Sequence, residues 1–392
     1  MWSSDLGSSR TNSVASRWLM GVLPASLYKM NADGANLTVL SVTRAITESF
    51  NKMAREGITV RDLKSRGGGV VVTRLKFVVT GFRGDWKAFV QVFGFNRLYS
   101  TDKVCWLCDG CKGSHNMTNC ITDVSVNAPW RSTYLVTAPW GTPPPYTSLV
   151  GFELSMVAPD LLHIWNLGMG RDLAGSILKV VIKDRRVFNG QSIDSRLNEA
   201  TDALRQYAKN TGQSLKIKRL TRGKLHWETR KYPELMTSGH DTAVVLEWLQ
   251  ETLQPYVHIY GDFLTLLWTS NWCFRLFYGT KEWFLTDAQR QTVRVLGRVF
   301  LQVYVGLART AIQNKELLWR FRPKSHLVDH CFELRRAVNP SRYSTWMDED
   351  VLKKLGKVLS MTASKTAQIG VLQRYLMGVP EHIRQAELAR VG

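Results

Sequence analysis

The feature that most constrains this chain is a short polar loop crowded with cysteine. Four of the six cysteines and one histidine lie between Val104 and Cys120, namely Cys105, Cys108, Cys111, His115 and Cys120. Thiolate and imidazole groups at such short spacing can converge on one tetrahedral zinc ion. Metal binding then supplies folding free energy to a loop that would otherwise be loose. We therefore predict one zinc ion in this loop.

Five candidate ligands compete for four coordination positions. Several choices are open, and two possible sets are Cys105, Cys108, His115 and Cys120, or Cys105, Cys108, Cys111 and Cys120. Neither set clearly leaves a position open for water, so we expect a structural role for the zinc. The alternative is a redox-active or unligated thiol cluster.

The charge of the chain favours polyanionic partners. Its 392 residues include 52 Lys and Arg against 32 Asp and Glu, a formal charge of +20, and nucleic acid is the polyanion we expect. The alternative is that the excess charge only aids solubility. A hydrophobic content of 44% suffices for two or three domains. The uneven distribution of cysteine favours a reducing compartment, and the polar start, Met1 to Arg17, predicts no secretion signal.

One segment, Ser214 to Lys231, concentrates the basic residues. Phosphate contacts and base stacking both suit its mixture of basic and aromatic side chains, which include His226 and Trp227. The alternative is a solvated surface hairpin. The predicted nucleic-acid-binding residues are Lys216, Lys218, Arg219, Arg222, Lys224, Arg230 and Lys231.

Hydrophobic periodicity predicts a largely helical chain beyond Asp160. The β-branched run Val70 to Thr80 is the strongest strand signal and follows a helical pattern over Thr38 to Met53. The most apolar stretch, Val293 to Ala308, is interrupted by two arginines and a glutamine, so we expect a core helix and no membrane span. The later helices are expected at Leu161–Lys183, Ser195–Asn210, Thr242–Phe277 and Thr286–Leu318.

Three acidic positions are candidates for chemistry. Asp85 follows the predicted strand, Asp160 and His163 share one helical face at i and i+3, and Glu349 lies at the start of a late helix. Each also has a simpler interpretation, as a turn residue, a helix cap or a partner of the helix dipole. Several carboxylates together would bind the two Mg²⁺ or Mn²⁺ ions that phosphodiester chemistry uses.

The order of these motifs resembles that of cut-and-paste transposases of the CACTA (En/Spm-like) and Kyakuja-Dileera-Zisupton groups. Asp85 resembles their second catalytic aspartate, Asp160 with His163 their Asp/Cys-x-x-His signature, and Glu349 their glutamate. The segment Pro323 to His326, with His330 beyond it, resembles the approach to that glutamate.

The resemblance implies a truncated ribonuclease-H-like α/β core with a large all-helical insertion and a small zinc loop. It implies DNA as the partner, a nuclear location, catalytic Mg or Mn, and no membrane, and it leaves a homo-oligomer open. The expected segments are 1–37 (polar start), 38–104 (first part of the core), 105–146 (zinc loop and proline-rich connector), 147–335 (helical insertion) and 336–392 (late core).

The first catalytic aspartate of these transposases has no counterpart here. Asp5 and Asp33 lie in a polar start and an Asp-Gly turn, so the two-metal site would be incomplete. Two functions follow as alternatives: a DNA-strand-transfer enzyme, incomplete or inactive in this chain, or a non-catalytic, zinc-stabilised nucleic-acid-binding protein. A third is a structural helical protein whose acidic motifs are all caps.

Overall fold

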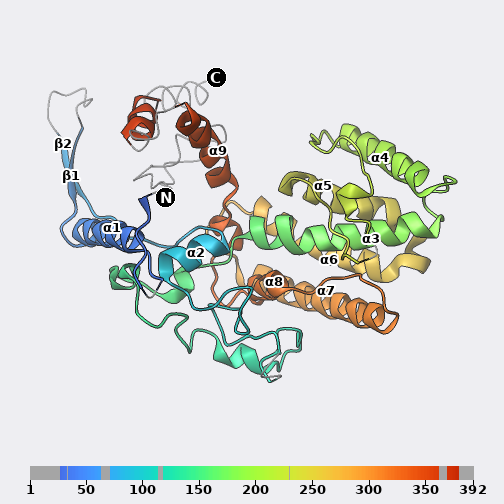
Figure 1. The fold of residues 1–392 in the computed structure, drawn as a ribbon, viewed down its shortest axis with the longest axis horizontal. Helices are drawn as coiled ribbons and strands as arrows, with labels where there is room; N and C mark the ends of the chain where they lie inside the picture. Colours follow the sequence, from blue (N-terminus) through green and yellow to red (C-terminus); the bar gives the residue numbers. More distant parts are fainter. Residues whose placement is uncertain are drawn as a thin grey trace. The chain divides into compact units, whose positions relative to one another are not determined.

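The structure, a computed structural model, describes residues 27–32, 34–62, 71–113, 118–228, 230–361 and 369–378. Within these ranges the chain is mostly helical (Figure 1), and the strands are β1 (Ile58–Asp62) and β2 (Val71–Leu75). The two strands pair antiparallel, with Ile58 opposite Leu75, to form one small sheet.

The predicted ribonuclease-H-like α/β core is wrong. The described residues contain no sheet beyond the β1–β2 hairpin, and a two-stranded sheet is too small to organise a core. The run Val70 to Thr80 is a strand only over Val71–Leu75, and residues 76–80 have no regular secondary structure. A β-branched run indicates extended backbone, but it cannot supply the neighbouring strands that a buried sheet requires.

The chain divides into two compact units, each built from separate stretches of sequence. Unit 1 comprises Met1–Gly94, Thr142–Val157 and Thr345–Gly392, and unit 2 comprises Phe95–Gly141 and Ala158–Ser344. The candidate metal centre lies wholly in unit 2.

The labelled helices of unit 1 are α1 (Leu37–Arg55), α2 (Trp86–Phe93) and α9 (Trp346–Ser360), and residues 369–378 are also helical. Helix α1 begins after Asn36, whose side chain accepts a hydrogen bond from the Val39 amide, and covers the predicted helical pattern. Near its end, the Asn51 side chain donates to the Ser148 carbonyl and so joins α1 to the 3₁₀ turn Pro145–Ser148.

Unit 2 is a helical body. In its described residues a π-helix, η5 (Leu162–Met169), precedes six α-helices: α3 (Gly170–Asp184), α4 (Ile193–Asn210), α5 (Gly239–Leu253), α6 (Val257–Gly279), α7 (Asp287–Gln313) and α8 (Pro323–Glu333). The predicted helix over Thr242–Phe277 is divided into α5 and α6 by a 3₁₀ turn at Gln254–Tyr256, because Pro255 cannot continue a helix interior. The Thr286 and Gln289 capping box starts α7 as predicted.

The core of unit 2 is aromatic where η5, α6, α7 and α8 meet. Trp165 stacks on Phe274 with ring centroids 4.2 Å apart and meets Phe300 edge on. Phe332 of α8 packs against both phenylalanine rings. A Cβ at Gly297 of α7 would lie 2.4 Å from Cγ of Phe332, so glycine is required for α8 to approach this closely. These contacts fix the position of α8.

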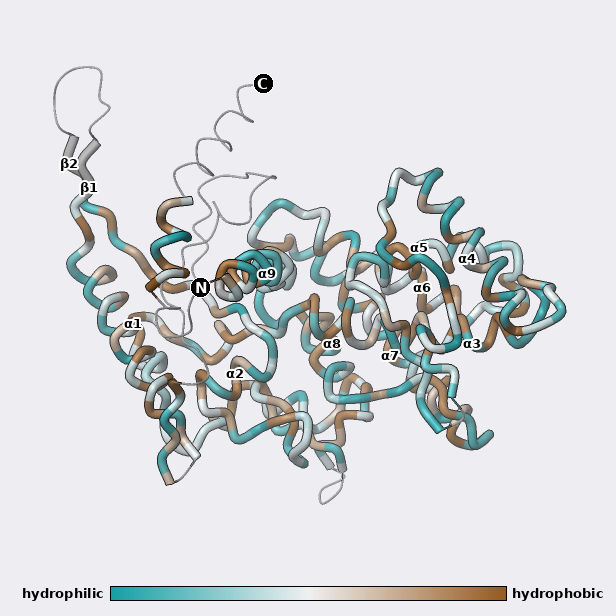
Figure 2. Tube along the Cα trace, turned by 45° about the horizontal axis from the view of Figure 1, so that its top comes forward, coloured by the Kyte–Doolittle hydropathy of each residue, from teal (hydrophilic) through white to brown (hydrophobic). Residues whose placement is uncertain are grey.

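Helix α7 is the one helix of the described ranges that is long and apolar enough to cross a bilayer by length and composition alone. It packs against α6 and α8 and buries Val293, Phe300 and Tyr304. Figure 2 shows hydrophobic and hydrophilic residues mixed along the helices of unit 2, a pattern typical of helices with one buried face.

Candidate metal centre

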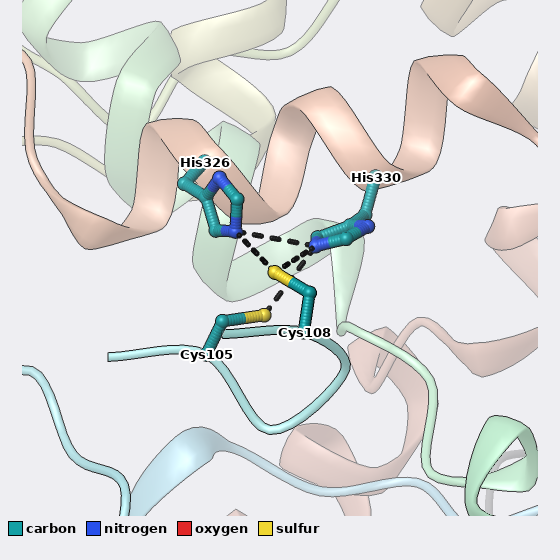
Figure 3. Close-up of side chains that lie close together, drawn as sticks. All are labelled: Cys105, Cys108, His326 and His330. Atoms are coloured by element: carbon teal, nitrogen blue, oxygen red, sulfur yellow. Dashed lines mark hydrogen bonds between the residues drawn. The ribbon is translucent and has the colours of Figure 1, made fainter. Parts of the chain in front are cut away.

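Two cysteines of the polar loop meet two histidines of α8. Cys105, Cys108, His326 and His330 each offer one ligand atom, and the four atoms lie within 4.8 Å of one another. In Figure 3 both imidazole rings project from α8 toward the sulfur atoms of the loop. His326 and His330 are four residues apart, so one face of the helix presents both rings.

Four of the distances between these atoms are close to the edges of a zinc tetrahedron. Nε2 of His330 lies 3.4 Å from both sulfur atoms, and Nε2 of His326 lies 3.2 Å from Sγ of Cys108. The two Nε2 atoms are 3.2 Å apart. Zinc bonds of about 2.3 Å to sulfur and 2.0–2.1 Å to nitrogen imply tetrahedral edges of roughly 3.3 to 3.6 Å between these atom types. The donor set therefore fits one zinc ion.

The backbone of the loop is shaped to hold the two thiolates. The Leu107 amide donates to Sγ of Cys105 at 3.3 Å, and the Gly110 amide donates to Sγ of Cys108 at 3.4 Å. A Cβ at Gly110 would lie 2.8 Å from Nε2 of His326, so a larger residue would push against the ligand. Glycine at this position lets the loop backbone approach α8.

Arg97 anchors the loop through hydrogen bonds to its backbone. Its guanidinium donates to the carbonyl oxygens of Cys105 at 3.0 Å and Cys108 at 2.5 Å, and to the Asp109 carboxylate at 2.8 Å. The buried charge of Arg97 is thus compensated by the turn that carries both cysteines.

A second link joins the loop region to α8. Arg131 donates two hydrogen bonds to the Asp329 carboxylate, at 2.9 and 2.8 Å, and also contacts Glu333 at 3.0 Å. Burial raises the pKa of Asp329, and the Arg131 charge opposes that shift. Trp130 packs edge on against the rings of His326 and His330. These contacts restrict the orientation of the ligands.

The pKa values of the two thiols shift in opposite directions. Burial tends to raise the pKa of Cys105, but the hydrogen bond from Cys108 and the nearby imidazoles hold this pKa well below its usual value. Burial raises the pKa of Cys108, and the neighbouring Cys105 raises it further. A bound zinc ion would favour the thiolate form of both residues.

The cluster in the structure differs from both predicted ligand sets. Cys105 and Cys108 belong to the cluster, whereas Cys111 and Cys120 pair with each other in an isolated β-bridge outside it. His115 lies outside the described residues. Sequence reasoning associated His326 and His330 with the approach to Glu349 and missed them as ligands. The signal that could have found them is the His-x₃-His spacing, which complements Cys-x₂-Cys in zinc sites.

The acidic candidates serve local structure. Asp85 is the N-cap of α2 and accepts a hydrogen bond from the Ala88 amide at 2.6 Å. Glu349 lies in the first turn of α9, 3.9 Å from the Lys353 ammonium. Among the described residues, the cluster of four above is the only group of three or more His, Cys, Asp or Glu placed to share a metal. The structure thus gives no support for a catalytic Mg or Mn site.

Asp160 and His163 do face each other. Nδ1 of His163 lies 2.5 Å from Oδ2 of Asp160, as the i, i+3 spacing predicts, and Oδ1 of Asp160 accepts from the Leu162 amide at 2.9 Å. Asp160 thus fixes the start of η5 and orients the imidazole. Their catalytic role stays a prediction.

All seven basic side chains predicted to bind nucleic acid are exposed on unit 2. The backbone beneath them is anchored from inside, since the buried Asp241 carboxylate accepts from the amides of Lys216 and Ile217 at 3.0 and 2.9 Å. Arg222 is paired with Asp194, and Lys231 with Glu228. The segment is therefore an ordered, solvent-facing basic strip, apart from Thr229, which lies outside the described residues.

No protein-family model and no curated protein matches this sequence. The resemblance to transposases therefore rests on the short motifs alone.

Proposed function

We propose that this chain is a non-catalytic nucleic-acid-binding protein whose helical unit is stabilised by a structural zinc ion on Cys105, Cys108, His326 and His330. The convergence of these four side chains, from segments 218 residues apart, is the observation that carries the proposal. Two thiolates and two imidazoles are a donor set typical of zinc. Four protein ligands complete a tetrahedron and leave no position for a reacting water, which favours a structural role.

Nucleic acid is the proposed partner because of charge. The net charge of +20 favours polyanions in general, and the exposed strip from Lys216 to Lys231 offers phosphate contacts on an anchored backbone. The non-catalytic alternative is preferred because Asp85 and Glu349 are already engaged in a helix cap and a first-turn ion pair. The order of the motifs supports a transposase-derived origin within this proposal.

Elemental analysis tests the metal part. Protein purified without chelator should contain one zinc per chain, and His326→Ala or His330→Ala should remove it. Cys111→Ser is the matched control, since Cys111 lies outside the cluster, and it should retain full zinc. Loss of zinc in Cys111→Ser with retention in His326→Ala would instead place the metal within the polar loop.

Salt dependence tests the nucleic-acid part. Replacing Lys216, Lys218, Arg219 and Arg222 by alanine should reduce the slope of log affinity against log salt for duplex DNA by about three to four, since each phosphate contact contributes about 0.9. A matched control replaces four exposed basic residues elsewhere: Lys87, Lys209, Lys281 and Arg309. An equal change in both variants would assign the strip to solubility alone.

A further inference from the structure

A pocket of about 420 Å³ opens on the surface of unit 2. None of the four candidate metal ligands is among the residues that line it. One face of α6 forms most of it, because Trp268, Asn271, Trp272 and Arg275 recur at helical spacing. Gln250 of α5 and Gln289 of α7 contribute from the neighbouring helices. The volume falls in the range of small-molecule sites.

The pocket offers unusual aromatic surface. Trp268 is 50% exposed although it belongs to a helix whose other face is deeply buried, and Trp272, one turn further on, is also partly exposed. Indole rings on a surface gain little from packing within the protein, and they are well suited to stacking on a flat ligand.

The polar groups of the pocket form a matched donor and acceptor. The Asn271 side-chain amide donates to the Leu246 carbonyl at 3.1 Å and to Oε1 of Gln250 at 2.8 Å, which fixes the orientation of both amides. Within the described parts of the chain, Oδ1 of Asn271 and Nε2 of Gln250 make no further hydrogen bond. An acceptor beside a donor matches the edge of a nucleobase.

Charge favours a base over a phosphate. Arg275 is the one charged residue among the described residues that line the pocket, and its guanidinium contacts the Glu247 carboxylate at 2.7 Å. This pairing leaves the pocket close to neutral, so a flat, uncharged ligand with hydrogen-bonding edges fits it best.

We infer that this pocket binds an unpaired nucleobase, with Trp268 and Trp272 as stacking surfaces and Gln250 and Asn271 as partners for the base edge. The inference rests on the proposed nucleic-acid function and adds to it a preference for single-stranded or unpaired bases. Nucleic-acid binding then has two contributions: phosphate contacts on the basic strip and base recognition in the pocket.

The test compares a short single-stranded oligodeoxynucleotide with an abasic strand of the same length. The protein should bind the base-bearing strand more tightly, and Trp268→Ala should weaken that binding about tenfold, within the range that one aromatic stack contributes. The same substitution should leave the affinity for the abasic strand unchanged. Gln250→Leu, which removes the amide donor at similar size, should give a smaller loss on the base-bearing strand only. Trp283→Ala, outside the pocket lining, is the control and should change neither affinity.

The outcomes separate this inference from the proposed function. Equal affinity of the unmodified protein for both strands, or an equal loss on both in Trp268→Ala, overturns the pocket and leaves backbone binding intact. Failure to bind either strand refutes the proposed function. Adenosine then decides the pocket through the indole NH resonance of Trp272, which the variant retains. A shift that Trp268→Ala abolishes supports the pocket, and no shift in the unmodified protein overturns it.

Discussion

Removing one thiolate of the metal centre should loosen a defined part of unit 2. We choose Cys108→Ser, because Sγ of Cys108 lies close to both imidazoles. The serine hydroxyl is a poor zinc ligand at neutral pH, so the substitution weakens the metal-mediated link between the loop and α8. The same exchange at Cys273 is the matched control, since Cys273 is equally buried, in α6, and lies outside the cluster.

The size of the effect follows from the length of chain that the metal closes. Cys108 and His326 are 218 residues apart, and a cross-link over a loop of that length restricts the unfolded chain by about 5 kcal/mol at 25 °C in the chain-entropy treatment. Arg131 and Asp329 still join the loop region to α8 in the variant, so this figure is an upper limit. Cys273→Ser should cost about 1–3 kcal/mol for a buried hydroxyl.

Hydrogen exchange read by mass spectrometry is the suitable assay, because a chain of two units need not unfold in one step. Cys108→Ser should reduce protection in peptides covering 104–113 and α8 by up to three or four orders of magnitude, since about 1.4 kcal/mol corresponds to tenfold. Chelation of zinc from the unmodified protein should give the same pattern. Cys273→Ser should affect peptides of α6 instead.

Two results would refute the reasoning. Unchanged protection of 104–113 in Cys108→Ser would show that the loop is held without the metal. Equal losses in that peptide from Cys108→Ser and Cys273→Ser would show a general loss of packing.

Two further predictions concern carboxylates outside the centre. Burial raises the pKa of Asp172 to about 7, with the Arg322 charge opposing the shift. A pKa raised above its unfolded value near 3.9 means that the native state binds the extra proton, so this stabilisation is lost as pH rises from about 4 to 7. Between pH 5 and pH 8 the urea midpoint should therefore fall more in the unmodified protein than in Asp172→Asn. An equal fall in both proteins would contradict the assignment. Asp85→Ala should cost about 1 kcal/mol through loss of the α2 cap, while Asp85→Asn, which retains a cap, should be nearly neutral by thermal unfolding. A much larger cost in Asp85→Asn would indicate a role beyond capping.

Local features of this chain could be predicted from its sequence because their physical causes are local. The Thr286 capping box sets the start of α7, and the Asp160–His163 contact follows from helical spacing alone. Pro255 could also have predicted the break between α5 and α6. The prediction of an α/β core was wrong because such a core needs a sheet, and the sequence of one strand does not specify its pairing partners. The order of the acidic motifs carried no information on which side chains meet.

The metal centre shows how proximity in sequence misleads. Cys111 and Cys120 are the cysteines nearest in sequence to Cys105 and Cys108. However, the Ile121 amide donates to the Cys111 carbonyl, and the Cys111 amide donates to the Asn119 carbonyl. This β-bridge holds the second cysteine pair in a separate turn. Each half of the site is local, a Cys-x₂-Cys turn and a His-x₃-His helical face, and only the fold joins them. Because α8 must already be placed against α7, through Gly297 and Phe332, to present both imidazoles, we expect high-affinity zinc binding to require the folded helical body, and a peptide containing the cysteine loop alone to bind zinc more weakly.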